Sequence, residues 1–105
     1  MKAKIEVTDG PAAGEVREIT DQDSFSIGRR ASNDMKILDK GISRTHCRID
    51  YDGDFFWLVD CNSRNGTFLN GERVTNSMLY DGDVVTIGHT QFVFRRPEEE
   101  DEDTF

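Results

Sequence analysis

The sequence has few of the residues that build disulfide scaffolds, metal sites or membrane spans. Its only cysteines, Cys47 and Cys61, lack Cys-x-x-Cys spacing, and His46 and His89 offer no ligand pair of recognisable spacing with them. We therefore expect no disulfide framework, metal or other cofactor, and we predict that both cysteines are small buried apolar residues. No apolar run approaches the ~20 residues of a membrane span, and residues 1–6 lack a signal-peptide core. A cytoplasmic protein without a membrane partner is expected.

Positive charges are outnumbered by negative ones, and the negative excess is concentrated at one end. The formal net charge is -8, but residues 98–103 are six consecutive acids and all 13 lysines and arginines precede them, which leaves -2 for the body. A weakly acidic body argues against nucleic acid as a partner, because duplex binding needs a broad basic face. The chain is long enough for one core only, so residues 1–96 are predicted to form a single domain and residues 97–105 a disordered acidic tail.

The sequence contains no amphipathic helical pattern longer than one turn. It contains instead many short segments in which apolar and polar residues alternate. Expected strands cover residues 2–8, 15–20, 25–28, 35–38, 46–51, 55–60, 67–69, 72–75, 84–87 and 91–94. So many short strands, separated by Gly and Asx turns, favour an all-β sandwich. The predicted core residues are Cys47, Ile49, Tyr51, Phe56, Leu58, Val85, Ile87, Phe92 and Phe94.

Polar loops at the strand ends carry the candidate functional residues. Asp52-Gly53-Asp54 predicts a hairpin turn, and folding the chain there places Ser43 opposite Ser63. Arg44 and Arg64, each next to one of these serines, then share one end of a sheet. Because the sequence places no carboxylate directly beside them, an anion site is predicted there.

An ordered set of motifs resembles the forkhead-associated (FHA) domain from about residue 25 to residue 94. The set consists of Gly28-Arg29, Ser43-x-x-His46 and Asn65-Gly66-Thr67, with Asn70-Gly71 downstream. The resemblance implies a sandwich of about eleven mostly antiparallel strands. Loops at one end of that sandwich would hold a phosphothreonine peptide in an extended conformation, in kinase-dependent signalling or assembly. The implied partners are a phosphothreonine-containing protein and an upstream Ser/Thr kinase.

The resemblance also assigns roles to individual residues of the site. It implies that Arg29 and Ser43 bind the phosphate, that Arg44 adds a second cation, and that Asn65 bonds the peptide backbone. A phosphate brings about -1.5 to -2 charge and three acceptor oxygens, which arginine forks and hydroxyl donors match. Arg64 departs from the family, where a small hydroxyl residue is commoner, and either a phosphate contact or a solvated position is open to it.

Other residues are predicted to support the site. Gly28 lets the backbone turn tightly before the arginine, and Gly66 is wanted for a positive φ. His46 is expected to tie loops together through backbone hydrogen bonds, and Thr67 completes the motif. In the family, loop residues outside the phosphate pocket choose the side chains that flank the phosphothreonine. Here those loops contain Lys40, Gly41 and Arg73, which hint at acidic flanks.

Two other functional classes compete with peptide recognition. Ser43 and His46 could be the nucleophile and base of an enzyme, but residues three apart in an extended segment point to opposite faces. There is no Gly-x-Ser-x-Gly elbow and no obvious orienting acid, so no catalytic residues are expected. A phosphate-independent interaction or assembly domain is the alternative, and phosphate dependence of binding distinguishes it.

The tail contains one residue with a possible regulatory role. Thr104 follows the six acids and could be phosphorylated by an acid-directed kinase. Phosphorylated Thr104 could then bind the domain of a second copy, which predicts phosphorylation-dependent self-association.

Overall fold

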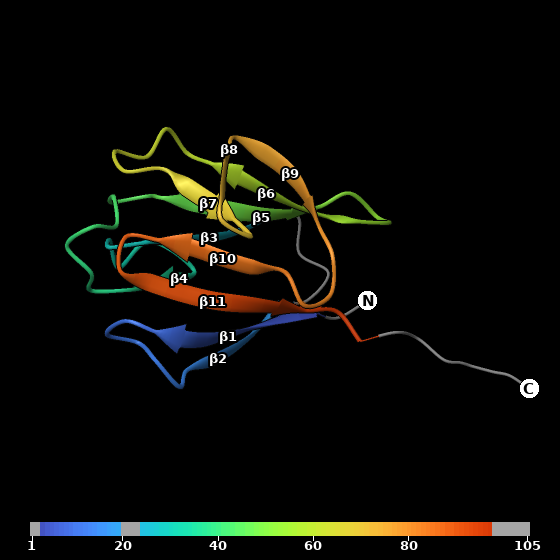
Figure 1. Ribbon diagram of the computed structural model, residues 1–105, viewed down its shortest axis with the longest axis horizontal. Helices are drawn as coiled ribbons and strands as arrows, with labels where there is room; N and C mark the ends of the chain where they lie inside the picture. The colour runs from blue at the N-terminus through green and yellow to red at the C-terminus, as the bar shows by residue number, and fades with distance from the viewer. Residues whose placement is uncertain (1–2, 20–23, 98–105) are drawn as a thin grey trace, which may run out of the picture.

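Two β-sheets packed face to face make up the fold in the computed structural model, which describes residues 3–19 and 24–97 (Figure 1). The strands are β1 (Ala3–Asp9), β2 (Val16–Ile19), β3 (Ser24–Gly28), β4 (Met35–Lys36), β5 (Cys47–Tyr51), β6 (Phe56–Asp60), β7 (Thr67–Leu69), β8 (Glu72–Val74), β9 (Asn76–Leu79), β10 (Val84–Ile87) and β11 (Thr90–Arg95). None of the residues described forms a helix that could cross a bilayer. The predicted all-β sandwich is confirmed.

The strands are divided six and five between the sheets. One sheet has the order β2-β1-β11-β10-β7-β8 and the other β4-β3-β5-β6-β9. All strand pairs in the described ranges are antiparallel except β3 and β4, where Ile27 lies beside Met35 in parallel register. The predicted mostly antiparallel arrangement is therefore correct.

The core fills the space between the inner faces of the two sheets. On β5 and β6, Cys47, Ile49 and Leu58 are buried and alternate with half-buried neighbours. Phe56 of one sheet meets Phe94 of the other with their ring centroids 5.4 Å apart. The alternating residues predicted for the core are confirmed, although Tyr51 at the end of β5 is only partly covered.

Cys61 corrects the prediction that both cysteines are buried. Cys47 is fully buried, whereas Cys61 is partly exposed, and both are free thiols. Cys61 lies just past the end of β6, and its Sγ is 3.9 Å from Nη1 of Arg48, which lies on the outer face of the sheet. Desolvation raises the pKa of Cys47 beyond the ordinary thiol range, so this thiol is an inert core residue.

Two strands differ from the sequence-based expectation. β9 was not predicted, because Asn76–Leu79 contains no alternation of apolar and polar residues, yet it pairs with β6 as an edge strand. β4 ends at Lys36 and is shorter than the predicted residues 35–38, although the alternation of burial continues, with Ile37 at 1% and Leu38 at 71% exposure. The turn between β7 and β8 is as predicted, with φ values of 50° at Asn70 and 88° at Gly71.

The connections are sorted between the two ends of the sandwich (Figure 1). The β3–β4, β4–β5 and β6–β7 loops gather at one end, on the left of the view. The β5–β6 turn lies at the opposite end, together with the start of β1 and the finish of β11. These three loops therefore lie away from the start of β1 and the finish of β11.

Candidate functional site

Three loops surround a cavity of about 350 Å³ at one end of the sandwich, which we call the pocket end. Arg29 enters it from the end of β3, residues 40–45 from the β4–β5 loop, and residues 64–65 from the β6–β7 loop. The lining residues are Arg29, Lys40, Gly41, Ile42, Ser43, Arg44, Thr45, Arg64 and Asn65. All five residues expected to contact a phosphopeptide therefore lie together.

Ser43 joins all three loops through its backbone and side chain. Its carbonyl accepts the amide of Arg29 at 3.0 Å, and its amide donates to Nδ1 of His46 at 3.0 Å. Its Oγ accepts the amide of Arg64 at 3.0 Å. Since the oxygen acts as an acceptor in that bond, the hydroxyl proton is left to donate to an anion.

The partner of Ser43 differs by one residue from the expectation. Ser43 was predicted to lie opposite Ser63, but β5 and β6 pair Tyr51 with Phe56 and Cys47 with Asp60. Continuing that register brings Ser43 to Arg64, which is the residue it bonds. The connection between the strands is one residue longer than expected, because Phe55 belongs to it and not to β6, and Ser63 is left outside the cavity lining.

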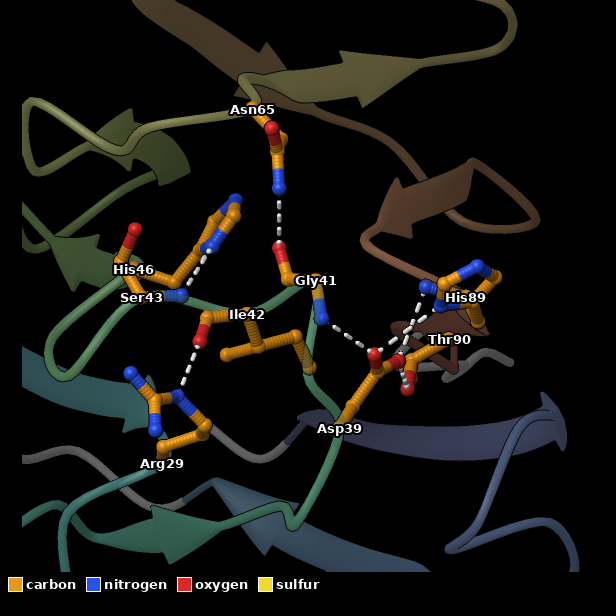
Figure 2. Close-up of polar contacts among 9 residues, drawn as sticks. All are labelled: Arg29, Asp39, Gly41, Ile42, Ser43, His46, Asn65, His89 and Thr90. Atoms are coloured by element: carbon orange, nitrogen blue, oxygen red, sulfur yellow. Dashed lines mark hydrogen bonds and ion pairs between the residues drawn. The ribbon is translucent and has the colours of Figure 1, made fainter.

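Arg29 is held in position by the loop beside it. Its Nε donates to the carbonyl of Ile42 at 2.6 Å, as Figure 2 shows. This bond fixes the plane of the guanidinium and leaves its two terminal nitrogens available. Among the residues described, no carboxylate forms an ion pair with Arg29, so the guanidinium can accept an anionic ligand as its counter-charge.

Asn65 already has a partner within the chain. Its Nδ2 donates to the carbonyl of Gly41 at 3.0 Å, which ties the β6–β7 loop to the β4–β5 loop (Figure 2). One N–H and the Oδ1 acceptor of the amide are not used by that bond. The side chain can therefore hold the two loops together and still contact a peptide backbone.

His46 lies beneath the cavity and is fully buried. Because Nδ1 accepts the amide of Ser43, Nε2 carries the proton and donates to the carbonyl of Gly66 at 2.8 Å. Contrary to expectation, Ser43 and His46 do meet, but through the serine amide rather than its hydroxyl. With both ring nitrogens engaged, the imidazole is not placed to deprotonate Ser43.

Gly28 is required for close approach and not, as expected, for a tight turn. A Cβ added there would lie 2.2 Å from the carbonyl oxygen of Arg44 and 2.6 Å from Nδ2 of Asn33. Its φ lies outside the left-handed region. Asn33 donates to that carbonyl at 2.7 Å, so the β3–β4 loop is bonded to the backbone of the cavity wall.

Asp60 shapes the β6–β7 loop from within. Its carboxylate accepts the hydroxyl groups of Ser63, at 2.5 Å, and Thr67, at 2.7 Å. Desolvation opposes ionisation of Asp60, but these hydrogen bonds prevail and its pKa is lowered. Gly66 then takes a φ of 95° and donates its amide to Oγ of Ser63. The predicted residues Gly66 and Thr67 thus define the course of this loop.

Asp39 is a site residue that the sequence analysis missed. Its side chain is buried at 3% exposure and accepts the amides of Gly41 and His89, each at 2.8 Å, and the hydroxyl of Thr90 at 2.7 Å (Figure 2). A Cβ on Gly41 would come within 2.8 Å of the Cα of Gly88. Asp39 therefore holds the cavity loop against the β10–β11 turn.

The local sequence predicts only part of the bonding of Asp39. Asp39-Lys40-Gly41 fits a turn in which an aspartate caps an amide two residues on. The bonds to His89 and Thr90 join positions about 50 residues apart, which no local pattern reveals.

Metal ligation is not indicated in the part of the chain that the structure describes. No group of three or more His, Cys, Asp or Glu side chains is placed there to hold an ion. The cavity combines cations with hydroxyl and amide donors, which suits an anionic ligand rather than a cation.

A family model described as the FHA domain matches residues 25–88. This chain belongs to the FHA family. The glycogen accumulation regulator GarA of Mycolicibacterium smegmatis is 39% identical over 92 residues, which cover 88% of this chain and 58% of that protein. The oxoglutarate dehydrogenase inhibitor of Corynebacterium jeikeium is 37% identical over 92 residues, with coverages of 88% and 63%. This FHA chain thus spans about three-fifths of the length of these relatives.

Solved FHA structures have the same fold. One, described as "Structural and functional analysis of phosphothreonine-dependent FHA domain interactions", superposes with a TM-score of 0.86 at 32% identity. The match covers 94% of this chain and 100% of that one. The family and the sandwich predicted from the sequence are confirmed.

Proposed function

We propose that this FHA domain binds phosphothreonine peptides at its pocket end and acts in kinase-dependent signalling or assembly. One observation carries the proposal: the cavity collects four cationic side chains, and no carboxylate is among the residues that line it. The solved relative described as phosphothreonine-dependent supports the choice of ligand.

The first contact of a phosphate is with Arg29 and Ser43. The guanidinium of Arg29 offers its two terminal nitrogens, and the hydroxyl of Ser43 offers a proton beside them. Arg44, next in the chain and exposed at the cavity wall, adds a second cation. Together they match the charge and acceptor oxygens of a phosphate monoester.

Asn65 would fix the register of the bound peptide. Its free acceptor and remaining N–H suit the amide and carbonyl groups of an extended backbone. Such contacts do not read side chains, so they position the phosphorylated residue without specifying its neighbours. Phosphoserine is expected to bind much more weakly than phosphothreonine, as the family resemblance implies.

Calorimetry with matched phosphorylated and unphosphorylated peptides tests this function. Only the phosphothreonine peptide should bind, with a dissociation constant near micromolar, or about -8 kcal/mol. Arg29→Ala removes a charged hydrogen-bond partner worth about 1.5 to 3 kcal/mol, so affinity should fall at least about tenfold.

Arg30→Ala is the matched control for that substitution. Arg30 is the next residue, also exposed, but it does not line the cavity. Equal binding by the wild type and Arg29→Ala would remove the basis of the assignment. Equal binding of the phosphorylated and unphosphorylated peptides would favour a phosphate-independent interaction domain instead.

We infer that the domain is not an enzyme. Its matched relatives are named as a regulator and an inhibitor. The engagement of both ring nitrogens of His46 also leaves Ser43 without a base. We further propose that the domain comprises residues 1–96, that it acts in the cytoplasm, and that a Ser/Thr kinase prepares its ligand. The free thiols of Cys47 and Cys61 fit a reducing compartment.

The proposed acidic tail, residues 97–105, lies outside the described residues except for Pro97. We propose that Thr104, once phosphorylated, binds the cavity of a second copy. β11 finishes at the end opposite the cavity, so contact within one chain would have to span the sandwich (Figure 1). Between copies, the contact is head-to-tail and can form chains or rings.

Light scattering tests this self-association. A protein stoichiometrically phosphorylated at Thr104 should associate as its concentration rises, and Arg29→Ala should reverse the effect. A monomer at every concentration, with the phosphate confirmed, would leave the tail as a solubilising segment.

A further inference from the structure

The cavity holds more positive charge than one phosphate neutralises. Arg29, Lys40, Arg44 and Arg64 all line it, and none forms an ion pair with a carboxylate among the residues described. A phosphate monoester carries about -1.5 to -2 charge. When a singly phosphorylated peptide binds, roughly two of the four positive charges are left without a counter-charge.

Several cations elsewhere on the described sheets have acidic neighbours, although Lys36 of β4 and Arg73 of β8 form no ion pair with a described carboxylate. Arg48 contacts Asp50 at 3.0 Å, and Lys4 and Arg95 both contact Glu6, at 3.5 and 3.3 Å. The fold therefore has local means of pairing a surface cation with an acid. The four cavity cations have no such carboxylate partners among the described residues, so the anionic groups of a ligand can pair with them.

The four cations fall into two pairs at different points of the cavity wall. Arg29 and Arg44 form the pair beside Ser43. The backbone amide of Arg29 donates to the carbonyl of Ser43, and Arg44 is the next residue in the chain. Lys40 and Arg64 flank the bond between Asn65 and Gly41, because each immediately precedes one of the bonded residues. A phosphate held at Ser43 is matched by the first pair.

We propose that Lys40 and Arg64 form a second anion subsite, which selects peptides carrying another negative group two residues from the phosphothreonine. This proposal rests on the proposed function of the cavity. In an extended peptide, side chains two positions apart point to the same side and are separated by about 7 Å. Both subsites line one cavity of about 350 Å³, a size that can accommodate two anions at this separation. Arg64, the departure from the family pattern, thereby gains a role.

The shared ligand chemistry is a second anion, which either a carboxylate or a second phosphate can provide. Calorimetry would compare a phosphothreonine peptide with neutral flanks to peptides that also carry Glu or phosphothreonine two residues before or after it. At low salt, at least one doubly anionic peptide should bind about fivefold or more tightly than the singly charged one. Comparing the Glu and phosphothreonine arms shows which source is preferred. High salt should reduce the preference.

A double-mutant cycle assigns the preference to its residues. The dissociation constant of the singly anionic peptide is divided by that of the doubly anionic peptide for each variant. In Lys40→Gln/Arg64→Gln this ratio should fall to about one, whatever the affinity for either peptide. The matched control is Arg30→Gln/Lys36→Gln, which removes the same charge from exposed residues outside the cavity lining and should keep the ratio. Arg29→Ala should weaken both peptides.

Each outcome separates this proposal from the function on which it rests. Equal affinity for singly and doubly anionic peptides in the wild type would eliminate the second subsite and leave phosphothreonine binding intact. An equal loss of preference in the control variant would attribute it to overall charge and also overturn the subsite. Failure of every phosphopeptide to bind would reject both proposals together.

Discussion

The two ends of the sandwich are held in opposite ways. At the far end, the β5–β6 turn is closed by its own residues: Asp52 accepts the amide of Phe55 at 2.8 Å and Nε1 of Trp57 at 2.8 Å. At the pocket end, the bonds that join one loop to another run between distant segments, as from Arg64 to Ser43, 21 residues apart. The far end is thus specified locally, whereas the pocket is specified only after the sheets have assembled.

Carboxylates show the same contrast. At the far end Asp52 is exposed and serves its own turn, while at the pocket end Asp39 is buried and serves a turn 50 residues away. Because Asp39 is turned inward, the exposed position next to it in the β4–β5 loop is occupied by a cation, Lys40. A substitution at the pocket end should therefore affect several loops at once, whereas one at the far end should stay local.

His46→Ala should give the largest effect. It leaves the amide of Ser43 and the carbonyl of Gly66 without partners, and each unsatisfied buried group costs about 1 to 3 kcal/mol. We expect a clear fall in melting temperature by calorimetry together with weaker phosphopeptide binding. Arg29→Ala is the control, because it should lower affinity while barely changing the melting temperature. An unchanged melting temperature in His46→Ala would show that the loops do not depend on this tie.

Asp39→Asn should have an intermediate effect, about 2 kcal/mol, because it weakens hydrogen bonds to a charged group. The effect should depend on pH. Burial opposes ionisation of Asp39, but hydrogen bonds from Thr90, Gly41 and His89 prevail and lower its pKa. A lowered pKa stabilises the folded state above the unfolded value of about 3.9, and this stability is lost as the pH falls below it.

Urea unfolding across an acidic pH series measures this dependence. The wild type should lose stability below about pH 4 more steeply than Asp39→Asn, so that the two converge in acid. Parallel curves would show that the Asp39 carboxylate is not the group responsible.

Asp52→Asn should give the smallest effect and sharpen the comparison. Its pKa is lowered by hydrogen bonds from the amides of Phe55 and Asp54 and from Trp57, but the group is exposed and its contacts are local. We expect a minor change in melting temperature and no change in phosphopeptide affinity. A loss of phosphopeptide affinity would show that a change at the far end alters the pocket, and would contradict the view that effects at the far end stay local.

The sequence could predict the features that depend on neighbouring residues, but not those that depend on contacts between distant segments. The β5–β6 hairpin and the turn at Asn70-Gly71 depend on neighbouring residues and could be anticipated, although the β5–β6 connection is one residue longer than expected. β9 could not, because Asn76–Leu79 becomes a strand through pairing with β6 rather than through its own pattern. The family's motif residues could be used to predict the position of the cavity. The role of Asp39 could not be predicted, because it depends on a hydrogen bond to His89, 50 residues away in the sequence.

The start of β1 and the finish of β11 lie at the same end of the sandwich, and this has a mechanical consequence. β1 and β11 are antiparallel neighbours, with Lys4 beside Arg95 at the end remote from the pocket. Tension applied between the two termini would load the hydrogen bonds of this pair one after another from that edge, as in opening a zipper, instead of shearing them all together. A pulling force should therefore separate β1 from β11 at low load before it deforms the loops around Ser43.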